Sequence, residues 1–216
     1  GFQTGKLVHF AAFNTECKTF SIAIPPLKKK FFVCGDSWNF KKTKSVELSL
    51  EKLNKLSGYK EKKPHKSKNY ILKRYVKHPY FFYTFHDVYE KNFYLGLVVS
   101  REVQHLGGRA LRIIDVLAEN NNISRIINEF VSTLKKSYHE YEYIDVYASN
   151  LDMNLLTEGN YELISDSQKI TIPDYFSPFE QKNIDIHFCT TDNQPACLFK
   201  GDGDQDNPRI RREYSE

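Results

Sequence analysis

The chain has 216 residues, 40% of them hydrophobic and 14% aromatic, which is enough to bury the core of one globular domain. It has no apolar run of the roughly 18 residues that a membrane span needs and no charged-then-apolar leader, so we expect a cytoplasmic protein. Its four cysteines, Cys17, Cys34, Cys189 and Cys197, are scattered and form no Cys-x-x-Cys pair, which argues against a disulfide scaffold and against structural zinc.

The net charge of +4 is unevenly distributed along the chain. Residues 28–77 hold sixteen Lys and Arg against four Asp and Glu, a local excess of +12. Such a segment attracts phosphates, whether of nucleic acid, an anionic membrane or a nucleotide-linked substrate. The alternative is a solvated linker, which the predominance of Lys over Arg favours, because bidentate phosphate binding favours Arg.

Two strands are predicted near the start, Lys6–Phe13 and Lys18–Ile24, with Asn14 and Thr15 as the hairpin turn between them. The next predicted element is a helix, Ser45–Leu56. Its leucines and valine stand at helical spacing, and Ser45 is a suitable N-cap. We expect the remainder of the basic stretch, Lys60–Lys68 above all, to be an exposed loop.

From residue 70 onward the pattern predicts a compact domain. Tyr80–Asp87, Phe93–Val103 and Arg109–Leu117 are predicted strands joined by short connections, which favours antiparallel pairing. An apolar stripe then predicts a helix, and a crossover places the strand Tyr143–Ala148 parallel to Arg109–Leu117. The stripe consists of Ile123, Ile126, Ile127, Phe130, Val131 and Leu134.

Shorter elements complete the prediction: a helix at Asp152–Glu158 and strands at Tyr161–Ser165, Gln168–Ile172 and Asp185–Thr190. The predicted fold class is therefore α+β, with a mixed, mostly antiparallel sheet, helices on both faces and a β-α-β crossover. The predicted division of the chain is residues 1–25, 26–69 (a basic linker with one helix) and 70–216 (the main domain).

The start of the strong helix is a candidate phosphate site. Its unpaired N–H groups, at residues 118–124, bind phosphate oxygens in other proteins. The alternative is that Asn121 or Asn122 simply caps the helix.

The order of these elements resembles the GNAT superfamily of acyl-CoA-dependent N-acyltransferases. The segment Ala148–Tyr161, ASNLDMNLLTEGNY, matches the Asn, short helix and terminal Gly-aromatic of that family. The stretches Ala110–Asp115 and Phe199–Asp206 resemble GNAT-like proteins associated with bacterial surface-polysaccharide synthesis.

The resemblance implies an acyl-CoA cofactor and transfer of its acyl group to an amino group of a nucleotide-linked or polysaccharide sugar. The implied cofactor-binding residues are Val116, Leu117, Ala118, Asn121, Asn122, Ile123, Ser124 and Asn150. The glycines of the usual pyrophosphate loop are absent from Asn120–Arg125. The Tyr that often acts as general acid is also absent, since Leu156 or Thr157 stands there.

The reaction would need a base to take the proton of the ammonium group. Asp115 is the first candidate, because period-2 alternation places it beside Leu111, Ile113 and Leu117, where burial would raise its pKa. The alternative is a carboxylate paired with Arg112 or another cation. Glu102, His86 and His105 are further candidates, each with a structural alternative.

The opening residues Gly1–Gly5, followed by strands, resemble the end of a GNAT half. We therefore hypothesise that residues 1–25 belong to a preceding GNAT-like half of a tandem protein, or that the chain forms a homodimer.

Asp202, Asp204 and Asp206 have the spacing of a calcium loop, but position six is not Gly and a predicted strand precedes them. A solvated turn or a family feature are the alternatives, and we assign no metal ligands.

Two other functions compete with acyl transfer. One is a catalytically silent GNAT-like module that binds carbohydrate, on the aromatic run at residues 80–85, or completes another domain. The other is nucleic-acid binding through residues 28–77, which no recognised motif supports.

Overall fold

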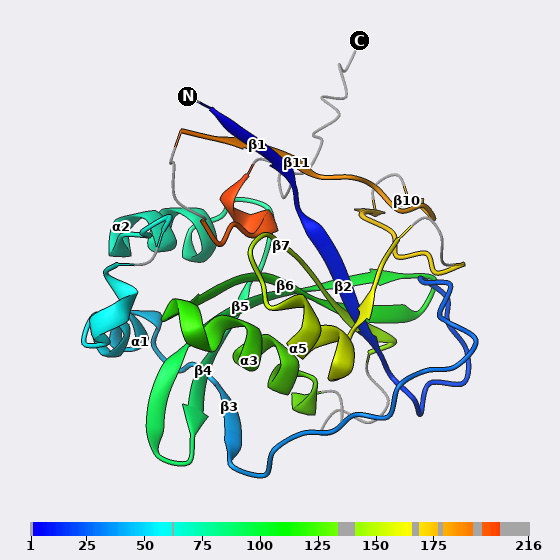
Figure 1. Cartoon of the computed structure of the whole chain (residues 1–216), viewed down its shortest axis with the longest axis horizontal. Helices are drawn as coiled ribbons and strands as arrows, with labels where there is room; N and C mark the ends of the chain where they lie inside the picture. Colours follow the sequence, from blue (N-terminus) through cyan, green and yellow to red (C-terminus); the bar gives the residue numbers. More distant parts are fainter. Residues whose placement is uncertain are drawn as a thin grey trace.

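A seven-stranded sheet organises the molecule (Figure 1). The computed structural model describes residues 2–61, 63–133, 141–165, 169–176, 179–191 and 196–203. The spatial order of the strands is β3 (Trp38–Lys42), β4 (Thr84–Glu90), β5 (Phe93–His105), β6 (Gly108–Ala118), β7 (Tyr143–Ala148), β2 (Val8–Phe13) and β8 (Glu162–Leu163).

Among the described residues, six pairs of neighbouring strands define this sheet, and only β6 and β7 run parallel. The helix α3 (Asn120–Phe130) makes the crossover between those two strands. The predicted fold class, a mixed and mostly antiparallel α+β sheet with one β-α-β unit, is therefore confirmed.

Helices cover both faces of the sheet, as predicted. On one face, here the α3 face, α3 and α5 (Met153–Glu158) pack on alternate strand residues such as Val98. On the opposite face, here the α1 face, α1 (Val46–Leu53), α2 (Lys68–Ile71) and the π-helical turn η2 (Leu72–Val76) cover Leu97 and Val99.

Smaller elements lie around the sheet. Strand β1 (Gln3–Lys6) pairs with β11 (His187–Thr190), and β9 (Tyr175–Phe176) pairs with β10 (Phe179–Glu180). The 3-10 turns are η1 (Ser57–Tyr59) and η3 (Lys200–Asp202). Within the described residues, every helix is too short or too polar to cross a membrane.

The elements with the strongest periodicity lie where the pattern predicted them. Strand β7 has the predicted bounds, and β5 and β6 exceed theirs by one or two residues. The predicted stripe of α3 is buried from Ile123 to Val131, whereas Leu134 lies outside the described residues. Ser45 caps α1 by accepting a hydrogen bond from the Leu48 N–H.

The predicted strand Lys18–Ile24 is wrong. Among the described residues of that segment, only Ile24 forms a β-bridge, to Thr171. The Glu142 carboxylate instead accepts the N–H groups of Ser21 at 2.7 Å and Ile22 at 3.1 Å. A buried side chain thus replaces the neighbouring strand as the partner of this backbone.

Two parts of the segment 26–69 pack into the domain, although most described residues of the predicted loop Lys60–Lys68 are exposed as expected. Residues 38–42 form the edge strand β3, and Lys66 is buried, with 3% of its surface exposed. Strand β2, from the predicted leading segment 1–25, lies between β7 and β8 of the predicted main domain. The boundaries themselves stay a prediction.

A β-bulge changes the face on which Asp115 lies. Val99 is opposite Asp115 and Ser100 is opposite Ile113, so Ile114 is the extra residue. Asp115 therefore shares the α1 face with Leu117, while Leu111 and Ile113 pack on the α3 face. The predicted grouping of all four on one face is wrong, because one inserted residue reverses the alternation.

Glu142→Ala should lower the free energy of unfolding by about 2–3 kcal/mol, because the buried N–H groups of Ile22 and Ala23 and the half-buried one of Ser21 would lose a charged acceptor. Urea denaturation measures the change. The exposed Glu158→Ala should stay within about 0.5 kcal/mol of wild type. Equal effects of the two substitutions would contradict the role assigned to Glu142.

Candidate functional site

The two parallel strands diverge soon after they meet. β6 and β7 pair only at Leu111–Ile144, Arg112–Asp145 and Ile113–Val146, although they continue to Ala118 and Ala148. The bulge at Ile114 lies where the pairing stops. This divergence is here called the wedge.

The chain itself fills the wedge with residues 196–203, here called the wedge segment. Phe199 forms a β-bridge with Ala148 of β7, and the Ser149 N–H donates to Leu198 O at 2.9 Å. On the β6 side, a Cβ added to Gly201 would lie 2.9 Å from Ile114 O. Gly201 thus touches β6 closely enough to exclude any larger side chain.

Side chains of the wedge segment pack on both faces of the sheet. Phe199 enters the core on the α3 face and is 1% exposed. Its neighbours Lys200 and Asp202 both enter buried ion pairs. The segment is therefore part of the core and not a surface strand laid over it.

The first ion-pair cluster holds Asp202 on the α1 face. Lys66 Nζ lies 2.6 Å from Asp115 Oδ2 and 2.8 Å from Asp202 Oδ1. Tyr75 Oη donates to Asp115 Oδ2 at 2.7 Å, and Tyr59 Oη donates to Lys66 O at 3.0 Å. Asp115, the first candidate base, is thus paired with a cation, as its structural alternative proposed, but with Lys66 and not with Arg112.

Two carboxylates share one ammonium group in this cluster. Burial by itself would lower the pKa of Lys66, but Asp115 and Asp202 outweigh it and raise that pKa. Burial raises the pKa of Asp202, and the nearby Asp115 adds to the rise against the opposing effect of Lys66. Lys66 therefore stays charged, and the excess negative charge favours proton uptake at Asp202.

The second cluster holds Lys200 through Arg112 of β6. Arg112 Nη2 lies 2.8 Å from Asp145 Oδ2, and Arg112 Nη1 lies 2.8 Å from Asp174 Oδ1. Lys200 Nζ forms an ion pair with the same oxygen of Asp174. Two cations and two carboxylates therefore balance one another in the core.

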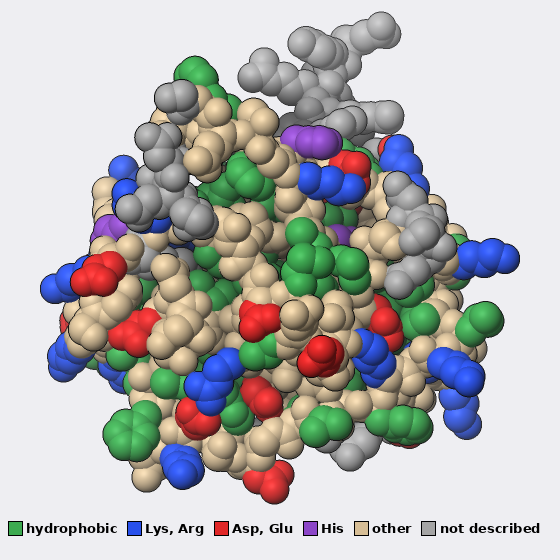
Figure 2. All heavy atoms as spheres, viewed as in Figure 1, with side chains coloured by type: hydrophobic (Ala, Val, Ile, Leu, Met, Phe, Trp, Pro, Cys, Tyr) green, Lys and Arg blue, Asp and Glu red, His purple; other side chains and the backbone are tan. Residues whose placement is uncertain are grey.

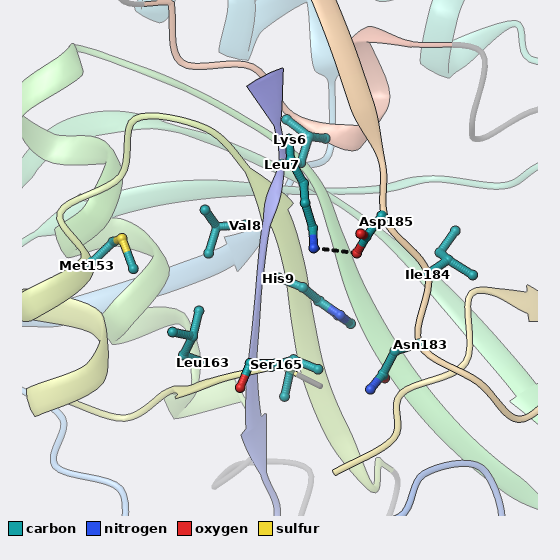
Figure 3. A pocket seen from close by; sticks show the side chains of 11 residues that line it. Lys6, Leu7, Val8, His9, Met153, Leu163, Ser165, Asn183, Ile184 and Asp185 are labelled. Atoms are coloured by element: carbon teal, nitrogen blue, oxygen red, sulfur yellow. Dashed lines mark ion pairs between the residues drawn. The ribbon is translucent and has the colours of Figure 1, made fainter. Parts of the chain in front are cut away.

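A pocket opens beside this second cluster (Figure 3). His9 of β2 lies in its wall, with Nε2 3.0 Å from Asp145 Oδ2 and its ring stacked on Tyr147. Burial lowers the pKa of His9 more than Asp145 raises it. Sequence reasoning missed His9; the available signal was a pair of charges, Arg112 and Asp145, inside otherwise apolar strands.

The other candidate bases lie apart from Asp115. His86 is on the α3 face, where its ring packs on Phe130 and Nε2 lies 3.2 Å from Ser100 Oγ. Glu102 accepts two bonds from Arg109, at 2.8 and 2.6 Å. His105 stacks on Phe179. Each of the three side chains contacts a neighbouring residue, as its structural alternative proposed. The catalytic assignments stay a prediction.

The predicted cofactor-binding residues at the end of β6 are core residues. Val116, Ala118 and Ile123 pack on the α3 face, and Leu117 packs on the α1 face. Glu119 is the N-cap residue of α3, and its side chain makes no capping hydrogen bond. The alternative that Asn121 or Asn122 caps this helix is therefore wrong.

Four further predicted residues lie near the helix start and the wedge. Asn121 is exposed and Asn122 is partly buried in the first turn of α3. Ser124 Oγ accepts from the Asp152 N–H at 2.9 Å, so it joins α3 to α5. Asn150, whose φ is 53°, donates to Ala196 O at 2.6 Å and holds the wedge segment.

Acyl-CoA does not fit the residues in this arrangement. Gly201 and Phe199 occupy the wedge beside the end of β6, where the resemblance implied acyl-CoA binding at Val116, Leu117 and Ala118. Glu119 brings a carboxylate to the start of α3, where its Oε1 accepts the Gly58 N–H at 2.9 Å. A negative charge at that place disfavours a pyrophosphate group.

The basic stretch is partly used inside the molecule. Lys29 and Lys30 donate to backbone carbonyls, Lys52 donates to Tyr89 Oη, and Lys66 is buried. On the face seen in Figure 2, Lys and Arg side chains alternate with Asp and Glu and gather over no single element. Nucleic-acid binding stays a prediction.

Asp202, the first of the three aspartates with calcium-loop spacing, lies in an ion pair. Besides its pairing with Lys66, Asp202 accepts the Phe199 N–H at 2.8 Å through Oδ2. Both carboxylate oxygens thus have protein partners. Asp204 and Asp206 lie outside the described residues.

Comparisons with known proteins found similarity among solved structures. No protein-family model matches the chain, and the search of curated proteins returned no match. Among solved structures, a GCN5-related N-acetyltransferase from Anabaena variabilis is similar, with a TM-score of 0.47 and 13% identity over 76% of this chain. The chain spans 39% of that protein's length.

Lys66→Met should lower the free energy of unfolding by about 3–5 kcal/mol, because two buried carboxylates would lose their cation. Chemical denaturation checks this. The exposed Lys73→Met should change stability by less than about 0.5 kcal/mol. Adding Asp115→Asn to Lys66→Met should restore part of the lost free energy of unfolding, because it removes the unpaired carboxylate. If stability does not recover, the loss does not come from the Lys66–Asp115 pair.

Stability should decrease as the pH falls from about 6.5 to about 4, in part because of His86. Burial lowers the pKa of His86 from 6.5 to about 4, so the unfolded chain takes up the proton first. The effect should reach at most about 3 kcal/mol near pH 4. The free energy of unfolding, measured by urea denaturation at each pH, should depend less on pH in His86→Gln than in wild type. The exposed His187→Gln should follow wild type. Parallel curves for all three proteins would refute it.

Proposed function

We propose that this chain is a GNAT-like domain that acts by binding a small molecule and not by acyl transfer from acyl-CoA. The observation that supports this most is the wedge segment, whose Gly201 lies against Ile114 while Phe199 bridges to Ala148. The segment occupies the place that an acyl-CoA arm requires under the resemblance.

Emptying the wedge would require the loss of several buried contacts at once. Lys200 would leave Asp174, and Asp202 would leave Lys66. Separation of a buried ion pair leaves uncompensated charge and costs about 3–5 kcal/mol per pair. Exposure of Phe199 adds about 1.5–3 kcal/mol. Cofactor binding would have to offset these terms, so the closed arrangement favours a silent module.

An acyl-CoA-dependent N-acyltransferase acting on an amino sugar is the second candidate. One observation favours it: β6 and β7 diverge after three residue pairs and α3 starts with an exposed first turn. This function needs the wedge segment to leave, and we assign no catalytic step to the chain in its closed arrangement.

Titration with acetyl-CoA tests the proposal. A ligand that binds only the folded state at 100 times its dissociation constant stabilises it by about 2.7 kcal/mol. We expect acetyl-CoA up to millimolar concentration to leave the thermal unfolding midpoint and the calorimetric heat of wild type unchanged.

A matched variant shows whether the wedge segment is the reason. Lys200→Ala with Asp202→Ala removes both ion pairs of the segment and leaves α3 and Glu119 intact. Binding to neither protein, or to the variant alone, supports the proposal. Saturable binding of acetyl-CoA to wild type would overturn it in favour of the acyltransferase.

A further inference from the structure

The pocket beside β2 is the strongest unassigned feature of the molecule. Its volume is about 360 Å³, sufficient for a small molecule. Figure 3 shows His9 directed from β2 towards Asn183, on the opposite side of the strand from Val8. The lining of the pocket includes Lys6, Leu7, His9, Asn183, Ile184 and Asp185.

The His9 ring is held in one orientation. It stacks on Tyr147 with ring centroids 3.7 Å apart and an interplanar angle of 13°. Nε2 lies 3.0 Å from Asp145 Oδ2, and Asp145 also accepts from Arg112. Such a fixed ring presents its second nitrogen, Nδ1, in a defined direction.

The charges around His9 determine which nitrogen carries the proton. Burial would raise the pKa of Asp145, but Arg112 and His9 outweigh it, and the pKa is lowered to about 2. The ionised Asp145 carboxylate can only accept a hydrogen bond, so Nε2 of His9 carries the proton and donates it in that bond. A second proton on His9 is not needed for charge balance, because Arg112 and Lys200 already balance Asp145 and Asp174. Neutral His9 then has a lone pair on Nδ1, for which the described residues provide no hydrogen-bond partner.

Most of the other lining groups are apolar or already paired. Asn183 donates to Ile170 O and accepts the Ile172 N–H, and Lys6 forms an ion pair with Asp185 at the surface. The lining therefore offers hydrocarbon contacts, an acceptor at His9 and no uncompensated charge among these groups. Such a site favours a neutral ligand with a hydrogen-bond donor.

We infer that this pocket binds a small cyclic alcohol, whose hydroxyl group donates to His9 Nδ1 and whose ring contacts the apolar lining. The inference rests on the proposed binding function and names its ligand class. The two claims fail on different results, because the pocket lies on β2 and not in the wedge. Saturable acetyl-CoA binding would overturn the proposed function, whereas absent binding of the alcohol would overturn only the inference about the pocket.

Two probes of the same shape test the inference. Cyclohexanol donates a hydrogen bond, whereas cyclohexanone can only accept one. NMR titration of the ¹⁵N-labelled protein should show unprotonated Nδ1 in His9 and a shift of that resonance with cyclohexanol. Cyclohexanone should bind about five- to tenfold more weakly, because one hydrogen bond to Nδ1 is lost.

Substitutions locate the site. His9→Phe retains the ring but removes the acceptor, and should abolish the preference for the alcohol. Ile184→Phe narrows the pocket without touching Asp145 and should weaken both probes. The exposed His187→Gln should bind as wild type does. Equal affinities of the two probes for wild type, no binding of cyclohexanol at tens of millimolar, or a protonated Nδ1 would each overturn the inference.

Discussion

The structure depends on two clusters of charges that are buried along a diverging pair of strands. Lys66 stands between Asp115 and Asp202, and Arg112 stands between Asp145 and Asp174. Each set includes a member from the wedge segment, Asp202 in one and Lys200 in the other. Removing one partner of a buried pair costs far more than the pair itself contributes, so the segment and the sheet stabilise one arrangement together.

This constraint separates the fold from the function that its resemblance implied. The diverging strands and the crossover helix are the parts on which an acyl-CoA site would be built, but here the chain's own residues occupy the divergence and a carboxylate stands at the helix start. A fold shared with enzymes does not carry their chemistry with it. The pocket at His9 lies beside the second cluster: Asp145 holds the imidazole in place through Nε2, and burial keeps the imidazole neutral.

Much of the architecture was predictable because it follows from local patterns. The stripe from Ile123 to Val131 and the apolar run of β7 read correctly, since helical and strand periodicity depend on residues only a few positions apart. The bulge at Ile114 was not predictable, because an inserted residue leaves no mark in an apolar strand. Lys66 looked like one more solvated lysine, and Glu142 gave no sign that it would bind the backbone of residues 21–23.

The sequence by itself determined the central strands β5, β6 and β7, the crossover helix and the class of sheet, because alternation and the 3.6-residue period are properties of short segments. Only the tertiary structure decided the site. Lys66 meets Asp115 across 49 positions, and His9 meets Asp145 across 136. No short-range pattern encodes such a pairing; the sheet brings these groups together, and the high energy of an unpaired buried charge then requires each to find its partner.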